Sequence, residues 1–129
     1  MSYLGLLLIA KIAVSVPFIA LPFLFSPLAK LEATTRINAK GSLFFRLYGV
    51  AIAALLVGYG FGVHVANSGQ FPWGVVSMGL VSNSGGAFLL LRASKPRSSG
   101  FWLGVFFALV AVALALSMGA PEMAISKAW

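Results

Sequence analysis

The chain has 129 residues and a formal charge of +7; 60% of its residues are hydrophobic, only 9% are charged, and its mean hydropathy is +1.01. Soluble domains are closer to half apolar and a quarter charged, so this composition predicts an integral membrane protein with a single domain over residues 1–129 and excludes nucleic acid as a natural partner. The chain contains neither cysteine nor aspartate, and its remaining acidic and imidazole side chains are Glu32, Glu122 and His64. Catalytic triads, carboxylate pairs and multi-histidine metal sites cannot be built from these residues, so we expect no enzyme activity and no metal.

Four apolar segments are each long enough to cross about 30 Å of hydrocarbon as a helix, at a rise of about 1.5 Å per residue. They cover residues 3–25, 43–65, 71–91 and 100–118. The predicted fold is therefore all-α, a bundle of four transmembrane helices with no second domain.

Prolines interrupt the first segment and the residues that follow it. Pro17, Pro22 and Pro27 recur at five-residue spacing. In a membrane helix such prolines produce kinks, because neighbouring groups can satisfy the freed carbonyls. Ser26 suits an N-cap and Pro27 suits the first helical position, so residues 27–40 are predicted to form a short interfacial helix.

Basic residues are distributed unevenly between the two sides of the predicted bundle. The loops at 26–42 and 92–99 carry Lys30, Arg36, Lys40, Arg92, Lys95 and Arg97, which we expect to contact lipid headgroups. Arg46 lies just inside the second segment on the same side, whereas the other side has only Lys11 and Lys127. The positive-inside rule then places both basic loops in the cytoplasm and both termini outside, in a bacterial inner membrane.

Small residues at four-residue spacing predict close contacts between helices. Gly58 and Gly62 form a GxxxG pair in the second segment, and Gly100 and Gly104 repeat the spacing at the start of the fourth. Such rows let helix backbones approach each other inside lipid. Packing within one chain is the simpler interpretation, and a face for another integral membrane protein is the alternative.

Two ionisable side chains have functional interpretations. Lys11 lies about 12 Å from the outer end of the first segment and either extends back to the interface or contacts an anion, a headgroup or a cofactor. His64, at the outer end of the second segment, most often would hydrogen-bond a carbonyl or water, but a lone histidine can also bind a haem or a pigment. The identity of any cofactor stays open.

The stretch "SNSGG", residues 82–86, is unusual because it lies near the centre of the third segment. Ser82, Asn83 and Ser84 need hydrogen-bond partners that lipid cannot supply. They either bond to neighbouring helices, with Gly85 and Gly86 allowing close approach, or the helix unwinds there and exposes its backbone to a ligand.

The stretch "LFFRLYGVAIAALLVGYGFG" (43–62) resembles the second-helix region of the DoxX-like group of small four-helix membrane proteins. Those proteins also place a basic residue and an aromatic-glycine pair at the start of an apolar span, here Arg46 and Tyr48-Gly49. The resemblance implies a compact four-helix bundle, in a group whose members are mostly uncharacterised or accessory to redox complexes.

Two functional hypotheses follow from these predictions. The first is a non-catalytic accessory or structural subunit of a larger inner-membrane complex, bound to other integral membrane proteins. The second is a small binding or transport protein for a lipid or lipophilic molecule. In the second hypothesis Lys11 and residues 82–86 line a cavity, with Gln70 and His64 at its outer mouth.

Overall fold

The structure, a computed structural model, describes residues 1–35 and 41–128. Within these ranges four helices are long and apolar enough to cross a membrane. These spans are Tyr3–Phe25, Leu43–Asn67 (α4), Trp73–Ala93 (α5) and Ser99–Gly119 (α6). The predicted all-α fold with four membrane-length helices is confirmed for the described residues. Each observed span begins and ends within two residues of its predicted position.

The first span is not one regular helix. It consists of α1 (Tyr3–Ser15), a π-helical turn η1 (Val16–Ala20) and α2 (Leu21–Phe25). Pro17 and Pro22 lack the backbone N–H that a regular helix needs. At the end of the π-helical turn the N–H of Leu21 donates to the carbonyl of Val16, five residues earlier. The prolines therefore distort the span without ending it.

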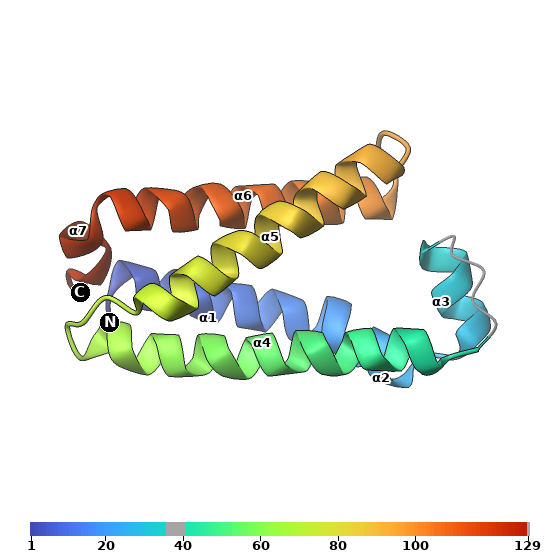
Figure 1. The fold of residues 1–129 in the computed structure, drawn as a ribbon, viewed down its shortest axis with the longest axis horizontal. Helices are drawn as coiled ribbons and strands as arrows, with labels where there is room; N and C mark the ends of the chain where they lie inside the picture. The colour runs from blue at the N-terminus through green and yellow to red at the C-terminus, as the bar shows by residue number, and fades with distance from the viewer. Residues whose placement is uncertain (36–40, 129) are drawn as a thin grey trace.

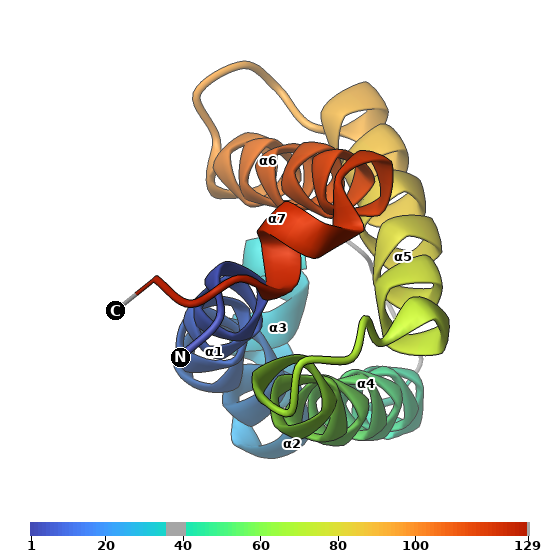
Figure 2. The ribbon, with the colours of Figure 1, turned by 90° about the vertical axis from the view of Figure 1, so that its left-hand side faces the viewer.

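The four spans are arranged as a ring. Figure 2, which looks along the bundle, shows α1, α4, α5 and α6 around it, with α7 (Pro121–Ile125) crossing from α6 to α1. α1 packs along α4 and α5 packs along α6, whereas α4 and α5 approach each other near their connecting loop and diverge toward the opposite end (Figure 1). The buried core includes Leu4, Leu8, Leu56, Tyr59, Val76 and Leu114. These residues fill the ring toward the end where α4 and α5 meet.

A short helix, α3 (Leu28–Thr35), lies across the end of the bundle opposite the termini (Figure 1). It buries Leu31 and contacts α6. The interfacial helix predicted over 27–40 thus begins one residue later than expected, and the rest of that prediction, with Arg36 and Lys40, lies outside the described residues.

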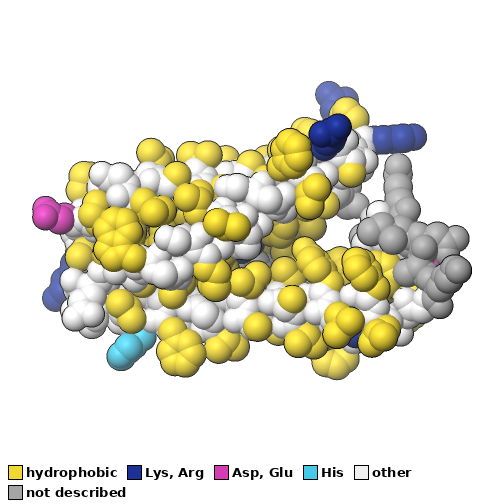
Figure 3. All heavy atoms as spheres, viewed as in Figure 1, with side chains coloured by type: hydrophobic (Ala, Val, Ile, Leu, Met, Phe, Trp, Pro, Cys, Tyr) yellow, Lys and Arg dark blue, Asp and Glu magenta, His cyan; other side chains and the backbone are white. Residues whose placement is uncertain are grey.

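The remaining loop cations lie at the same end as α3. They are Lys30, Arg92, Lys95 and Arg97, all exposed. Figure 3 shows Lys and Arg side chains gathered at the tip formed by α5 and α6, far from the single histidine and from the acidic side chain at the other end. These four cations therefore gather at one end of the bundle, as the charge pattern predicted, while Lys127 lies at the other end with the termini.

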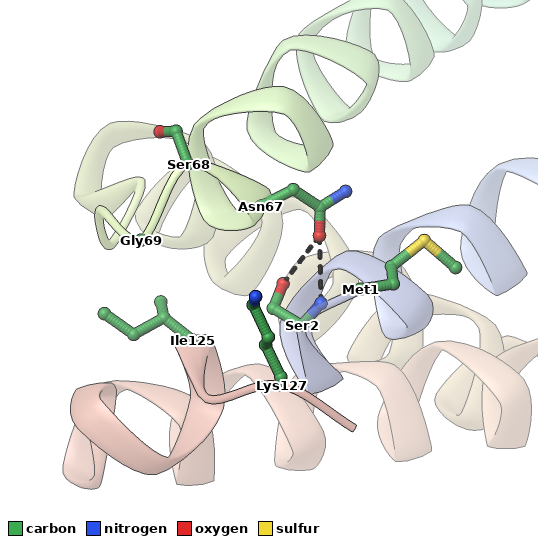
Figure 4. A pocket seen from close by; sticks show the side chains of 7 residues that line it. All are labelled: Met1, Ser2, Asn67, Ser68, Gly69, Ile125 and Lys127. Atoms are coloured by element: carbon green, nitrogen blue, oxygen red, sulfur yellow. Dashed lines mark hydrogen bonds between the residues drawn. The ribbon is translucent and has the colours of Figure 1, made fainter. Parts of the chain in front are cut away.

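The opposite end is closed by contacts between the two ends of the chain. Residues 1–3 pair with residues 126–128 through a short antiparallel bridge between Ser2 and Lys127. Asn67, the last residue of α4, accepts hydrogen bonds through Oδ1 from the backbone N–H of Ser2 (2.9 Å) and from its hydroxyl (3.1 Å), as Figure 4 shows. These contacts join α1, α4 and the C-terminal segment.

Arg46 fastens the other end of α4 to the first span. Its guanidinium donates to the carbonyl oxygens of Phe23 (3.0 Å) and Ser26 (2.9 Å). Both carbonyls lie at the C-terminal end of α2, where a helix leaves carbonyl groups without N–H partners. Arg46 at the start of the second span therefore has a structural role: it supplies donors to the carbonyl groups at the end of the first span.

We expect Arg46→Ala to lower the free energy of unfolding by about 3 kcal/mol, because two charge-assisted hydrogen bonds are lost and two carbonyls are left without a donor. Arg46→Lys should recover about half of that loss. Titration with a denaturing detergent measures the difference, and exposed Lys95→Ala is the matched control. Equal stability of Arg46→Ala and Lys95→Ala would contradict the assignment.

Candidate intramembrane binding site

A cavity of about 260 Å³ lies between α4 and α5, and its inner wall is formed by the first span and α6. Its polar lining residues are Lys11, Ser15, Tyr48, Tyr59, Ser82 and Asn83. The surface is visibly hollowed between α4 and α5 (Figure 3). The structure therefore brings together Lys11 and part of the 82–86 stretch, which come from different spans.

Lys11 points into this cavity instead of extending back to the interface. Its side chain is only 6% exposed, and Nζ lies 4.2 Å from the ring centre of Phe107 and 4.8 Å from that of Phe106. Among the described residues no carboxylate forms an ion pair with it. The two aromatic faces stabilise the ammonium only in part, because a cation–π contact is worth about 2 kcal/mol or less.

Gly86 determines where Phe107 lies. A β-carbon at Gly86 would be 2.8 Å from Cδ2 of Phe107, which is too close for any other residue without a shift of the ring. Phe107 is 5% exposed and lines the cavity beside Lys11. The glycine in α5 thus allows the aromatic ring of α6 to lie under the ammonium.

Asn83 is held in one orientation by its neighbours. Its Nδ2 donates to the hydroxyl of Tyr59 (2.9 Å) and to the carbonyl of Gly79 (2.7 Å). A flipped amide would place an oxygen against that carbonyl, so the assignment of the two amide atoms is unambiguous. Ser82 donates to the same carbonyl at 3.2 Å. Oδ1 of Asn83 is left without a partner among the described residues, although the side chain is only 2% exposed.

Ser15 supplies the second unpartnered group. Its side chain is 1% exposed, and within residues 1–35 and 41–128 no group forms a hydrogen bond with its Oγ. Ser15 lies one helical turn after Lys11 on the same face of α1, and both line the cavity. Most buried polar atoms in proteins do have a partner, so two unpartnered oxygens that line one cavity make this cavity the candidate binding site.

The polar part of the cavity lies near the middle of the bundle's length. Asn83 is ten residues from each end of α5, and Ser15 is twelve residues after the start of the first span and ten before its end. Each of these distances is about 15 to 18 Å at about 1.5 Å per residue. If the spans cross a membrane, these polar groups are as far from water as the bilayer allows.

Ser84 and Gly85, the other residues of the 82–86 stretch, face away from the cavity. α5 is a continuous helix through it, so the unwound alternative is wrong. Ser82, Asn83 and Gly86 face inward, whereas Ser84 and Gly85 are exposed. A β-carbon at Gly85 would have nothing within 4 Å, so this glycine does not pack against another helix of the chain, contrary to expectation. Helical periodicity separates the two sets.

The other predicted packing glycines lie in two kinds of contact. β-carbons at Gly58 and Gly62 would be 3.1 Å from Cε of Met78 and 2.7 Å from Cγ1 of Val75, both on α5. Gly104 lies against Leu91 in the same way, at 3.0 Å. The space at Gly100 is instead taken by the hydroxyl of Ser94 in the preceding loop. Gly100 therefore permits the turn between α5 and α6, and does not pack two spans together.

His64 and Gln70 are both exposed, and neither lines the cavity that contains Lys11. The expected outer mouth formed by these two residues is therefore wrong, because the cavity does not extend to their end of the bundle.

No group of three His, Cys, Asp or Glu side chains within the described residues could hold a metal ion. A haem or pigment on His64 would have to lie on the outer face of α4.

A second cavity, of about 460 Å³, lies at the end of the bundle that holds the chain termini. Figure 4 shows its lining side chains around the Ser2–Asn67 contact. Its rim is exposed at Ser68, Gly69 and Lys127, and the oxygen of Asn67 already has two donors. Within the described part of the chain, this hollow contains no buried polar atom that lacks a partner.

Sequence reasoning missed Ser15 and Tyr59. Ser15 could have been found, because it lies four residues after Lys11 and so shares its helix face. Tyr59 carries no comparable signal, since nothing in the sequence pairs it with Asn83.

Comparison of the chain with protein-family models, with curated proteins and with solved structures found no match. The DoxX-like resemblance over 43–62 stays a prediction.

Proposed function

We propose that this chain binds a small lipophilic molecule with a polar head group inside the membrane, in the cavity between α4 and α5. One observation carries the proposal: a buried lysine without an acidic partner among the described residues and two orphan polar oxygens line the same cavity. A ligand head group would supply the missing partners.

The energetics favour a binding role over a purely structural one. An unpartnered polar group in an apolar environment costs about 1–3 kcal/mol, and a buried charge costs more. A packing role would be served equally well by an apolar side chain at Lys11 and Ser15, whereas Asn83 also joins α5 to α4 through Tyr59. Ionisable residues within membrane spans are expensive and usually functional for that reason.

The orientation is part of the proposal. The exposed cations Lys30, Arg92, Lys95 and Arg97 support placing their end of the bundle in the cytoplasm of a bacterial cell and both termini outside. α4 and α5 diverge toward the basic end, so the cavity would open in the cytoplasmic half of the inner membrane.

The test uses the full chain in proteoliposomes and a dodecanol probe that carries a photoreactive diazirine. Illumination should label peptides that line the cavity, and Asn83→Leu should abolish this labelling by filling the polar end. Ser84→Leu is the matched control, since the neighbouring residue faces outward on the same helix. Absence of cavity labelling in the wild-type chain, or equal labelling of Asn83→Leu, would overturn the proposal.

An accessory role in a larger membrane complex is the second candidate, and the outer face of α5 favours it. Ser77, Ser84 and Gly85 are exposed within a membrane-length helix, and the two hydroxyls make no hydrogen bond to the described residues. Lipid tails offer such hydroxyls no partner, whereas a neighbouring helix does. Purification from native membranes in mild detergent distinguishes the two: a partner in fixed stoichiometry that is lost with Ser84→Leu supports this role.

A further inference from the structure

The geometry points to the class of ligand and to its route: a single-chain lipophilic carboxylate that reaches the cavity sideways from the lipid, through the opening between α4 and α5. This inference rests on the proposed function and adds the charge of the head group and the direction of access.

The negative charge of the ligand's head group is inferred from the hydrogen-bond donors that line the cavity. The ammonium of Lys11 has three hydrogens and no carboxylate partner among the described residues. Ser15 adds a hydroxyl with no partner in this part of the chain. Tyr59 accepts from Asn83, and the acceptor within reach of its own hydrogen is Oγ of Ser82 at a long 3.5 Å, so a carboxylate oxygen would be a stronger acceptor for it. These groups match the two oxygens of a carboxylate. A neutral head would leave the ammonium unpaired, and a cationic head would be repelled.

A single negative charge fits better than a double one. Lys11 is the one cation among the described residues that line the cavity. A phosphate monoester carries about −1.5 to −2 charges at neutral pH, so it would leave excess negative charge in a place that water does not reach. Oδ1 of Asn83 remains as an acceptor for a hydroxyl beside the carboxylate.

The walls and the opening define where the chain of the ligand lies. Ile52 and Leu55 of α4 and Leu89 of α5 supply apolar lining on the two sides of the cavity. Ala51 and Leu89 are exposed on the outer surface as well as lining the cavity, which places an opening between the two helices. Ala51 is eight residues into α4, or about 12 Å from its start, so this opening faces hydrocarbon.

The charge is tested with three diazirine probes that share one alkyl chain: dodecanoate, dodecanol and dodecylamine. We expect the wild-type chain in proteoliposomes to be labelled by dodecanoate at least about tenfold more than by dodecanol, and least by dodecylamine. Lys11→Met should remove the preference while dodecanol still labels the cavity. Lys11→Arg should retain the preference, because it retains the charge.

The route is tested at Ala51. Ala51→Trp should lower labelling by about tenfold or more by blocking the opening, whereas Ala54→Trp, which is exposed on the same helix but does not line the cavity, should not. Since the chain has no cysteine, Ala51→Cys offers a second measurement in a protein that is already folded. Reaction of that thiol with N-ethylmaleimide, carried out to completion in detergent at alkaline pH where the thiolate forms and before reconstitution, should slow labelling, and Ala54→Cys should be insensitive.

The outcomes separate this inference from the proposed function. Equal cavity labelling by the three probes would overturn the anionic ligand and leave an intramembrane binding site. Stronger labelling by a monododecyl phosphate probe than by dodecanoate would overturn the carboxylate. Unchanged labelling in Ala51→Trp and in the blocked Ala51→Cys would overturn the lateral route. Absence of cavity labelling by every probe would overturn the proposed function itself.

Discussion

Lys11→Met is expected to stabilise the empty protein by about 1 kcal/mol or more. Removal of the ammonium eliminates a desolvation penalty of several kcal/mol, and no acidic partner among the described residues offsets that penalty. The opposing loss is the cation–π attraction to Phe106 and Phe107, worth about 2 kcal/mol at most. Because the desolvation penalty exceeds this attraction, the substitution should be stabilising. Methionine also fills a similar volume, so it leaves no new void beside the rings.

The free energy of unfolding, measured by denaturing-detergent titration of ligand-free protein, checks this expectation. Exposed Lys127→Met serves as the control and should change little. Added dodecanoate should stabilise the wild-type chain more than Lys11→Met, because a ligand stabilises the state that binds it in proportion to its affinity. A loss of stability in Lys11→Met without ligand would show that the lysine already has its partner within the chain.

Gly62→Leu should be the most destabilising substitution in α4, lowering the free energy of unfolding by about 3 kcal/mol or more. Three spans meet at this residue: a β-carbon there would lie 2.7 Å from Cγ1 of Val75 on α5 and 3.0 Å from Cδ1 of Leu8 on α1. Overpacking of a well-filled core typically costs about 1–3 kcal/mol, and here two neighbouring helices must move together.

Gly60→Leu is the control for this prediction, because it lies two residues away on the same helix and a β-carbon there meets nothing within 4 Å. It should fold normally. The comparison removes helix propensity as an explanation, since both variants replace glycine by leucine in one helix. Similar losses of stability in the two variants would mean that α4 does not approach α5 at Gly62.

The spans were predictable because their length and hydropathy are local properties of the sequence. The orientation of residues 82–86 could be predicted only in part. Helical periodicity shows that Asn83 and Gly86 share one face of α5, but it does not show that this face points into the bundle. The orientation of Lys11 was not accessible, because it depends on Phe107, which lies 96 positions later in the chain. Likewise, the π-helical turn after Ser15 follows from the combination of two prolines with tertiary packing.

The hydrogen bonds that join residues 1–3, Asn67 and the C-terminal segment determine how α4 and α5 can move relative to each other. At this end α4 is held to α1 and the C-terminal segment by hydrogen bonds and to α5 by the turn through Gly69 at a φ of +83°. α4 and α5 are therefore held together at this end and separate toward the basic end. α4 has 25 residues and is about 37 Å long. Ala51, at the opening, is 16 residues from Asn67, or about 24 Å, so a tilt of α4 by about 3° would widen the opening by about 1.3 Å. On the proposed lateral route, small adjustments near the termini would therefore set the width of the opening between α4 and α5.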